Sequence, residues 1–444
     1  MTRFPPTLAV LALLMVPSPG GAQTGAEPLS LPRAIAMALA GNPDVAAVTA
    51  GEAAAGAGLD AAQGAWFPRI TLEEGWQRGN QPVYVFGSLL AQRRFTEADF
   101  AVRTLNDPDA LGNHRAAVHV EQVLFDGGRT RALARAAESA AGVSSADRAS
   151  AEAGTAEAVA RTYAGILVAD AAVRAADAAV ATAESDAARA RARRDTGLAT
   201  EADALSFDVH LARMRSARIT AAEDATVARA TLNRLLGVPL DTPWEFVTPS
   251  VPPPPPDPTD PGDVSGRPDV RRAGFGVDRA IADTGLARSA LLPQVSLQGG
   301  YEWNGHAWTS RASSWVVGLQ ARLSLSLAGT ERARVTAAQH TLARARAERD
   351  ATEADARLDI RQARARLDAA RARLAVAAAV VAQSRESQRI LRDRYDAGLA
   401  TVTDVLRAAD AVLAADTLET TSRTDVLVAT VMFERALGRI PRGE

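Results

Sequence analysis

The side chains that most often carry chemistry are few or widely spaced in this sequence. It contains no cysteine and no lysine, so its 50 basic residues are all arginines. The chain therefore lacks disulfides, thiolate metal sites, cysteine nucleophiles and the lysine of a Walker A motif. Its five histidines do not have metal-ligand spacing, and no HExxH motif occurs: they are His114, His119, His210, His306 and His340. We predict no catalytic residue, no metal site, no cofactor and no enzymatic activity.

Charged residues are distributed along the chain rather than gathered in patches. The arginines are interleaved with 52 acidic residues, and the net charge at pH 7 is -2. This mixing gives no electrostatic footprint for nucleic acid. Carboxylates near arginines are typical of solvated helix faces. Because 47% of the residues are hydrophobic, a sizeable core is expected.

The N-terminal residues have the features of an export signal. Arg3 is followed by an apolar stretch over residues 8–16 and by small residues up to Ala22, which predicts a signal peptide over residues 1–22. No later window offers about 18 uninterrupted apolar residues, so no membrane-spanning helix is expected in the mature chain. If the exported chain enters a membrane, it must do so as a β-barrel.

The remainder of the chain consists of two related halves. An offset of 225 residues aligns Pro43 with Pro268, and an offset of 201 residues aligns Gly197 with Gly398. The change of 24 residues predicts an insertion in the first half, within about residues 78–113, and such insertions lie in loops. The predicted domains are residues 29–239 and 267–440. The proline-rich residues 240–266 between them are predicted to form a linker without helix or central strand.

Each half contains a long segment typical of a helix. Residues 129–195 contain no proline, and their counterparts 330–396 contain neither proline nor glycine. A helix of this length would reach roughly 100 Å at 1.5 Å per residue. Apolar side chains recur every seven residues at matching positions, which predicts a coiled-coil-like seam. They are Val159, Ile166, Val173 and Val180 in the first segment, and Ile360, Leu367, Leu374 and Val381 in the second.

Four other segments alternate apolar and polar residues with a period of two. The clear ones are residues 293–303 and 313–327, and the weaker ones are 69–76 and 116–125. The pattern is typical of a strand between lipid and a water-filled lumen, although an amphipathic hairpin in a soluble protein explains it equally well. Four strands cannot close a membrane barrel, because about eight is the smallest number that can. Aromatic residues near the strand ends would suit an interfacial girdle: Trp76, Tyr301, Trp303 and Trp315.

Several motifs resemble those of the TolC family of outer-membrane efflux channels. They are LSLPRAIAMALAGNPDV at 29–45, VLFDGGRTRAL at 123–133, LNRLLG at 232–237, and the turn motifs RDTGLATEADAL and RYDAGLATVTDVL. The resemblance implies long antiparallel α-helical hairpins that form a periplasmic α-barrel. It also implies four β-strands per chain, two structural repeats per chain, and a homotrimer that shares a 12-stranded transmembrane β-barrel. The second half has SLAGTER at 326–332, which departs from the FDGG form of the first junction.

The same resemblance implies a function and a location. The protein would be a channel in outer-membrane lipid that extends into the periplasm. It would passively conduct small molecules, such as drugs, toxic compounds or metal ions, from a periplasmic adaptor (membrane fusion) protein and an inner-membrane pump of the RND or ABC type. The outer component of a type I protein secretion system is an alternative, and nothing in the chain distinguishes it from an efflux channel. A soluble periplasmic coiled-coil scaffold is an alternative of another class, which the alternating segments oppose.

The two GLAT turns are the candidate sites. Gly197 and Gly398 are predicted to end the long helices in the left-handed conformation. The following threonine and aspartate of each turn are predicted to form a capping box, which is sufficient to explain their presence. The resemblance implies adaptor docking at Gly197, Leu198, Thr200, Gly398, Leu399 and Thr401. It also implies a periplasmic gate at Asp203, Tyr395, Asp404 and Arg407, although Arg407 stands where some relatives carry an acidic residue.

Overall fold

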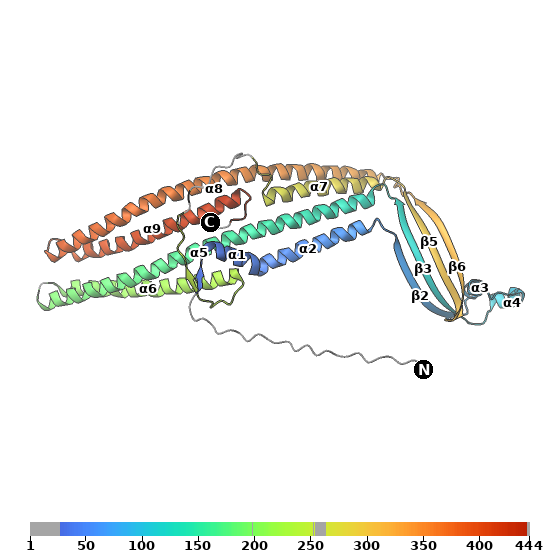
Figure 1. The fold of residues 1–444 in the computed structure, drawn as a ribbon, viewed down its shortest axis with the longest axis horizontal. Helices are drawn as coiled ribbons and strands as arrows, with labels where there is room; N and C mark the ends of the chain where they lie inside the picture. Colours follow the sequence, from blue (N-terminus) through green and yellow to red (C-terminus); the bar gives the residue numbers. More distant parts are fainter. Residues whose placement is uncertain (1–26, 198, 252, 254–262, 442–444) are drawn as a thin grey trace, which may run out of the picture.

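The computed structural model describes residues 27–197, 199–251, 253 and 263–441. The predicted signal peptide, Leu198 and part of the predicted linker lie outside the described residues. The molecule is elongated, with long helices along most of its length and a four-stranded sheet at one end (Figure 1). In chain order the elements are β1 (Glu27–Leu29), α1 (Leu31–Gly41), α2 (Pro43–Gly64), β2 (Arg69–Gly79), α3 (Pro82–Ala91), the 3-10 helix η1 (Glu97–Phe100), α4 (Val102–Asn106), β3 (Leu111–Phe125), α5 (Arg129–Asp195), α6 (Glu201–Leu236), β4 (Trp244–Phe246), α7 (Pro268–Ser289), β5 (Gln294–Ala307), β6 (Ser310–Arg322), α8 (Thr330–Asp396) and α9 (Val402–Ala436).

The two longest helices have the predicted bounds. Both α5 and α8 contain 67 residues, and each follows a glycine in the left-handed conformation, Gly128 or Gly329. Most of the seven-residue pattern is buried: Val159, Ile166, Ile360, Leu367 and Val381. Val173, Val180 and Leu374 are only partly buried. The first junction is held by Asp126, which accepts bonds from the backbone and hydroxyl of Thr130. In the second junction, the Ser326 backbone amide instead donates to the Glu331 side-chain carboxylate at 3.1 Å.

The helices form two hairpins that lie side by side. Helix α5 packs against α6, and α8 packs against α9, while α2 and α7 lie along the parts of α5 and α8 nearest the sheet (Figure 1). The main apolar core lies at mid-height, where α1, α5, α6 and α9 meet. A second core joins α7, α8 and α9, and a third lies near the tips. The far ends of both hairpins therefore lie at the end of the molecule opposite the sheet.

A short two-stranded sheet crosses the helices at mid-height. Strand β4 lies within residues 240–266 and pairs in parallel with β1, a contact that the sequence did not predict. Tyr163 of α5 is fully buried beneath this sheet, and its hydroxyl lies 2.7 Å from the Leu29 carbonyl oxygen and 2.6 Å from that of Val247. Burial raises the pKa of Tyr163 to about 12, so the hydroxyl stays protonated. The predicted linker is thus attached to the helices through main-chain atoms.

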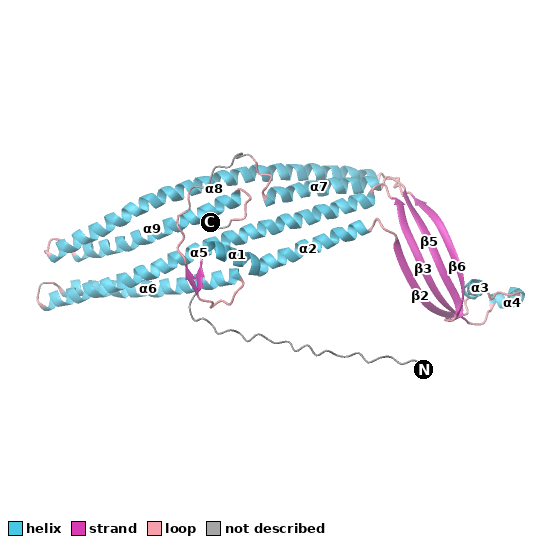
Figure 2. Cartoon of the chain, viewed as in Figure 1, coloured by secondary structure: helices cyan, strands magenta, loops and turns pink. Residues whose placement is uncertain are grey.

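The four-stranded sheet is antiparallel throughout, in the order β2-β3-β5-β6 (Figure 2). All four predicted strands are present, but the last is shorter than its alternating pattern. Strand β6 ends at Arg322, so Leu323 and Leu325 lie beyond it. Arg322 pairs with Gln294, the first residue of β5, and the preceding Pro293 has no amide proton with which to extend the ladder.

The two faces of this sheet differ in polarity. One face is mainly polar and carries ion pairs between neighbouring strands, such as Arg115 with Glu302 at 3.0 Å. The other face exposes large apolar side chains, and Leu72, Trp315 and Leu319 are each at least 70% exposed. A sheet face with this much exposed apolar surface is expected to contact lipid or another apolar surface.

The predicted insertion lies between β2 and β3. Residues 80–110 contain α3, η1 and α4, whereas β5 and β6 are joined by a short turn at residues 308–309. These helices lie at the end of the sheet farthest from the long helices (Figure 2). The extra residues of the first half therefore form a small helical unit at one end of the molecule.

Candidate functional site

The two hairpin turns have the backbone conformation that their glycines predict. Gly197 has a φ of 74° and Gly398 a φ of 75°, so both occupy the left-handed region that glycine tolerates. In the second turn the amides of Gly398 and Leu399 donate to carbonyls of the last helical turn, at 2.9 Å and 2.7 Å. Leu399 is 69% exposed, which makes it a projecting apolar side chain at the tip.

Each turn also contains the predicted capping box. In the first, the Asp203 amide donates to the Thr200 hydroxyl at 3.2 Å and the Thr200 amide donates to the Asp203 carboxylate at 3.1 Å. In the second, the Thr401 amide donates to the Asp404 carboxylate at 3.0 Å, and the Thr401 hydroxyl lies 2.6 Å from it. These side-chain and backbone bonds lower the pKa of Asp404 below its ordinary value. Both aspartates are therefore bonded within their own turns.

Of the four gate candidates, Tyr395 is the residue that contacts the other hairpin. Its ring packs edge-on against Phe207 of α6, with the ring centroids 6.2 Å apart. The guanidinium of Arg193 on α5 lies 5.1 Å from the Tyr395 ring centre, a cation–π distance. Arg407 is exposed on α9 and helps to lower the pKa of Asp404 through its charge. The structure thus brings Tyr395 to the contact between hairpins and keeps the two aspartates in their caps.

A further contact near the tips was missed by the sequence analysis. The Asp186 side chain on α5 is only 10% exposed. It forms ion pairs with Arg189 of its own helix at 2.5 Å and with Arg392 of α8 at 3.2 Å. The second pair joins the two hairpins three residues before Tyr395. In a chain with 50 arginines, a single Arg and a distant Asp carry no sequence signal of pairing.

Apolar contacts surround these polar ones. Phe207 and Leu211 of α6, Ala187 of α5 and Val402 of α9 belong to one buried cluster, with Tyr395 at its edge. The cluster therefore includes side chains from both hairpins. Separation of the hairpin ends would expose part of it to water.

The girdle candidates share the apolar face of the sheet. The strand pairing places Trp76, Tyr301, Trp303 and Trp315 on this face, toward its loop end. An ion pair of Glu74 with Arg311 lies on the same face at 3.0 Å. A second group of exposed apolar side chains at the helix end of the sheet was not singled out from the sequence: Trp66, Phe67, Leu124, Phe125 and Leu327.

Comparison with known sequences identifies the family. The profile of the family described as outer membrane efflux protein matches residues 34–238 and 264–439. The chain belongs to the outer membrane efflux protein family. It is therefore an outer-membrane channel protein that extends into the periplasm, and members of this family are not enzymes. The family is generally trimeric and works with adaptor and inner-membrane pump partners.

Solved structures of similar fold cover nearly the whole chain. A membrane protein from Pseudomonas aeruginosa superposes with a TM-score of 0.78 at 22% identity, over 92% of this chain and 93% of that chain. The outer membrane protein VceC from Vibrio cholerae gives 0.76 at 20% identity, over 92% and 96%. The outer membrane channel CmeC from Campylobacter jejuni gives 0.79 at 18% identity, over 92% and 85%. No curated protein matches the sequence significantly.

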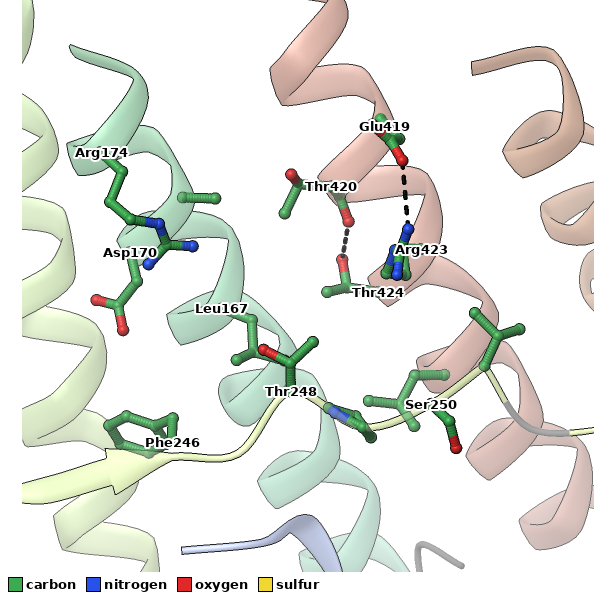
Figure 3. A pocket seen from close by; sticks show the side chains of 14 residues that line it. Leu167, Asp170, Arg174, Phe246, Thr248, Ser250, Glu419, Thr420, Arg423 and Thr424 are labelled. Atoms are coloured by element: carbon green, nitrogen blue, oxygen red, sulfur yellow. Dashed lines mark hydrogen bonds and ion pairs between the residues drawn. The ribbon is translucent and has the colours of Figure 1, made fainter. Parts of the chain in front are cut away.

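One cavity of this efflux protein lies beside the crossing segment that follows β4. It has a volume of about 310 Å³ and lies between α5 and α9, with Leu167, Phe246 and Thr248 at its wall (Figure 3). Its charged side chains are largely engaged with neighbours, since Asp170 pairs with Arg229 at 2.7 Å and Glu419 with Arg423 at 3.3 Å. Among the described residues that line the cavity, no serine or threonine hydroxyl forms a hydrogen bond with a basic or acidic side chain.

Within the described ranges, no group of three or more potential ligands is placed to hold a metal ion. None of the helices in the described part of the chain combines the length and apolarity needed to cross a lipid bilayer.

Proposed function

We propose that three copies of this chain form one exit duct, the outer-membrane channel of a tripartite efflux pump. The observation that carries the proposal is the four-stranded sheet, which has one apolar face, one polar face and two open edges. In the described part of the chain, β2 and β6 each pair on one side only. Four strands cannot close a barrel alone, whereas three copies supply twelve.

In this assembly the β2 edge of one copy pairs with the β6 edge of the next. Pairing satisfies the main-chain groups of both edges, which lipid would otherwise leave without partners. The apolar face, with Leu72 and Leu319, lies against lipid, and the girdle candidates lie near its outer boundary. The polar face, with Arg115 and Glu302, lines the lumen.

The helical part continues the duct into the periplasm. The turns at Gly197 and Gly398 lie at its far end, where an adaptor docks through exposed side chains such as Leu399. The contacts of Tyr395 and of Arg392 hold the two hairpins of one copy together near the entrance. Opening of the duct requires these contacts to rearrange, and transport itself is passive. The duct would carry small molecules. A channel role fits the efflux family, whereas a soluble scaffold does not.

The test compares two neighbouring residues on opposite faces of β6. Leu319→Arg places a charge on the proposed lipid face, at a cost of about 2 to 4 kcal/mol near the bilayer centre, and should abolish recovery of trimers from outer membranes. Gln320→Arg places the same charge on the proposed lumen face and should be tolerated. Native mass in detergent reports the trimer. A wild-type chain that is monomeric, or equal recovery of both variants, would rule out the proposal.

A further inference from the structure

The inserted helices pack on the polar face of the sheet. The Gln92 side-chain amide, just after α3, donates to the Gly112 carbonyl at 2.9 Å and to the Asn113 side chain at 3.0 Å. Asn113 in turn donates to the side chain of Asn304 at 2.7 Å, and both asparagines are buried. The strand pairing places Asn113 and Asn304 on the same face as Arg115 and Glu302. Helix α3 therefore lies on the side of the sheet that is proposed to line the lumen.

Two more contacts fix α3 at this position. The Tyr84 hydroxyl donates to the Gln77 carbonyl at 2.7 Å, and its ring lies against Gly79. Beyond the helix, the Arg93 guanidinium donates to the Ser313 carbonyl of β6 at 2.9 Å. Arg93 has a φ of 54°, in the left-handed region that residues other than glycine rarely adopt. The helix is thus bonded to β2, β3 and β6 at the loop end of the sheet.

The insertion also has a small core of its own. Phe95 packs edge-on against Phe86 and against Phe100, with centroid distances of 5.0 Å in both pairs. Thr96 and Asp99 form a capping box, with the Thr96 amide 2.7 Å from the Asp99 carboxylate. These contacts give the segment a defined shape, so the side chains that it exposes are presented in fixed directions.

Several of the exposed side chains are large and apolar. Val83 is 86% exposed, Leu90 49%, Phe100 65% and Val102 74%. Val83 and Leu90 are seven residues apart, so they lie on one side of α3. Because α3 packs on the polar face, Val83 and Leu90 are on the side of the sheet away from the proposed lipid surface, and Phe100 is joined to this helix through Phe95 and Phe86. They therefore need an apolar partner other than lipid.

We propose that the helical insertions of the three copies contact one another through these side chains and narrow the outer mouth of the channel. The inference rests on the proposed trimer, whose rotational symmetry places three identical insertions around one axis. The occupant of each apolar surface is the same segment of a second copy. The second half of each chain has only a short turn at the equivalent position, so it leaves this space to the insertions.

Disulfide cross-linking tests the contact directly, because the chain contains no cysteine. Variants Val83→Cys, Leu90→Cys, Phe100→Cys and Val102→Cys are purified as trimers, each alone and co-expressed in pairs, because a threefold contact can join different residues of neighbouring copies. The trimers are oxidised and run on denaturing gels without reductant. At least one variant should give a disulfide-linked dimer, with the third chain of each trimer left unlinked. Leu72→Cys, equally exposed but on the apolar face, should give none. If none of the four variants links, alone or in mixed trimers, in a protein of trimeric mass, the insertions do not meet and this inference fails, while the proposed duct stands.

Access to the lumen provides a second readout. Thr71 lies on the polar face below the insertion, where it pairs with His119. A Thr71→Cys variant in intact cells should react slowly with a bulky polymer-linked maleimide added from outside. Replacement of residues 83–106 by a short Gly-Ser turn should make the reaction markedly faster. Equal rates with and without the segment, in trimers of normal mass, would overturn the proposal, whereas loss of the trimer in the parent chain would instead refute the duct.

Discussion

Arg392 of α8 lies 3.2 Å from the carboxylate of Asp186 on α5, and this ion pair joins the two helical hairpins near their tips. The pair is partly shielded from solvent, since the side chains are 29% and 10% exposed. Asp186 also pairs with Arg189 of its own helix. Asp186 therefore forms one ion pair within its own hairpin and one ion pair with the other hairpin.

The first prediction concerns this shared carboxylate. Arg392→Gln should weaken the contact between hairpins by about 1 to 3 kcal/mol, because a hydrogen-bonded charge loses one of its partners. The hairpin ends should separate more often, and the conductance of reconstituted trimers in planar bilayers should rise. Arg389→Gln is the control, since Arg389 pairs with Glu386 and Asp393 on its own helix. Equal conductance of the two variants would show that the Asp186 contact does not restrain the entrance.

The second prediction concerns pH. The Glu157 side chain is 11% exposed and pairs with Arg161 at 2.7 Å and with Arg435 of α9. Burial opposes its ionisation, but hydrogen bonds and charges from both arginines outweigh burial and lower the pKa of Glu157. Since the folded-state pKa lies below that of the unfolded chain, this stabilisation is present above about pH 4.5 and is lost as the pH falls through the lowered value.

Thermal unfolding between pH 7 and pH 3 measures this effect. Glu157→Gln should lower the free energy of unfolding at pH 7 by about 1 to 2 kcal/mol, a value kept small because the two arginines are half-exposed to solvent. It should also reduce the loss of stability as the pH falls from 7 to 3. Glu386→Gln is a matched control, because that carboxylate is 56% exposed. A Glu157→Gln variant with the wild-type acid slope would contradict the assignment.

The third prediction concerns adaptor docking. Leu399→Ser removes an exposed apolar side chain from the second turn without touching the buried cluster. We expect adaptor affinity to fall by about tenfold, which corresponds to about 1.4 kcal/mol, while the thermal stability of the trimer is unchanged. Leu418→Ser on α9, also exposed but distant from the tip, should bind normally. Titration of the purified adaptor onto immobilised trimers distinguishes the two variants.

The fourth prediction concerns the crossing segment. Tyr163→Phe removes the hydroxyl that lies between the carbonyl oxygens of Leu29 and Val247, and should destabilise the protein by about 1 to 2 kcal/mol because a buried hydrogen bond is lost. Tyr84→Phe removes a single bond at an exposed site and should cost less. Urea unfolding of detergent-solubilised trimers gives both values. A larger loss of stability in Tyr84→Phe than in Tyr163→Phe would contradict this prediction.

Local chemistry explains which parts of the structure were predictable. The bounds of α5 and α8 follow from runs without proline, and the caps at Thr200 and Thr401 follow from residues three positions apart. Such signals lie within a few residues of the structure that they determine. The alternation of β5 and β6 likewise requires no knowledge of distant partners, although the end of β6 depends on where β5 begins.

The unpredicted features all depend on distant partners. Strand β4 forms because it meets β1, which lies more than two hundred residues earlier in the chain. Asp186 and Arg392 pair because two hairpins pack side by side. The docking of α3 on the polar face depends on Asn113 and Asn304 from two different strands. No periodicity within one segment encodes contacts of this kind.

The equal lengths of α5 and α8, 67 residues each, constrain how this protein can change during evolution. Both hairpin ends must reach the same distance from the membrane if one adaptor is to contact them together. A seven-residue deletion in α5 alone would shorten one hairpin by about 10 Å and leave its turn out of reach. Viable length variants should therefore carry matched insertions or deletions in α5, α6, α8 and α9, so that the two halves of the gene change size together.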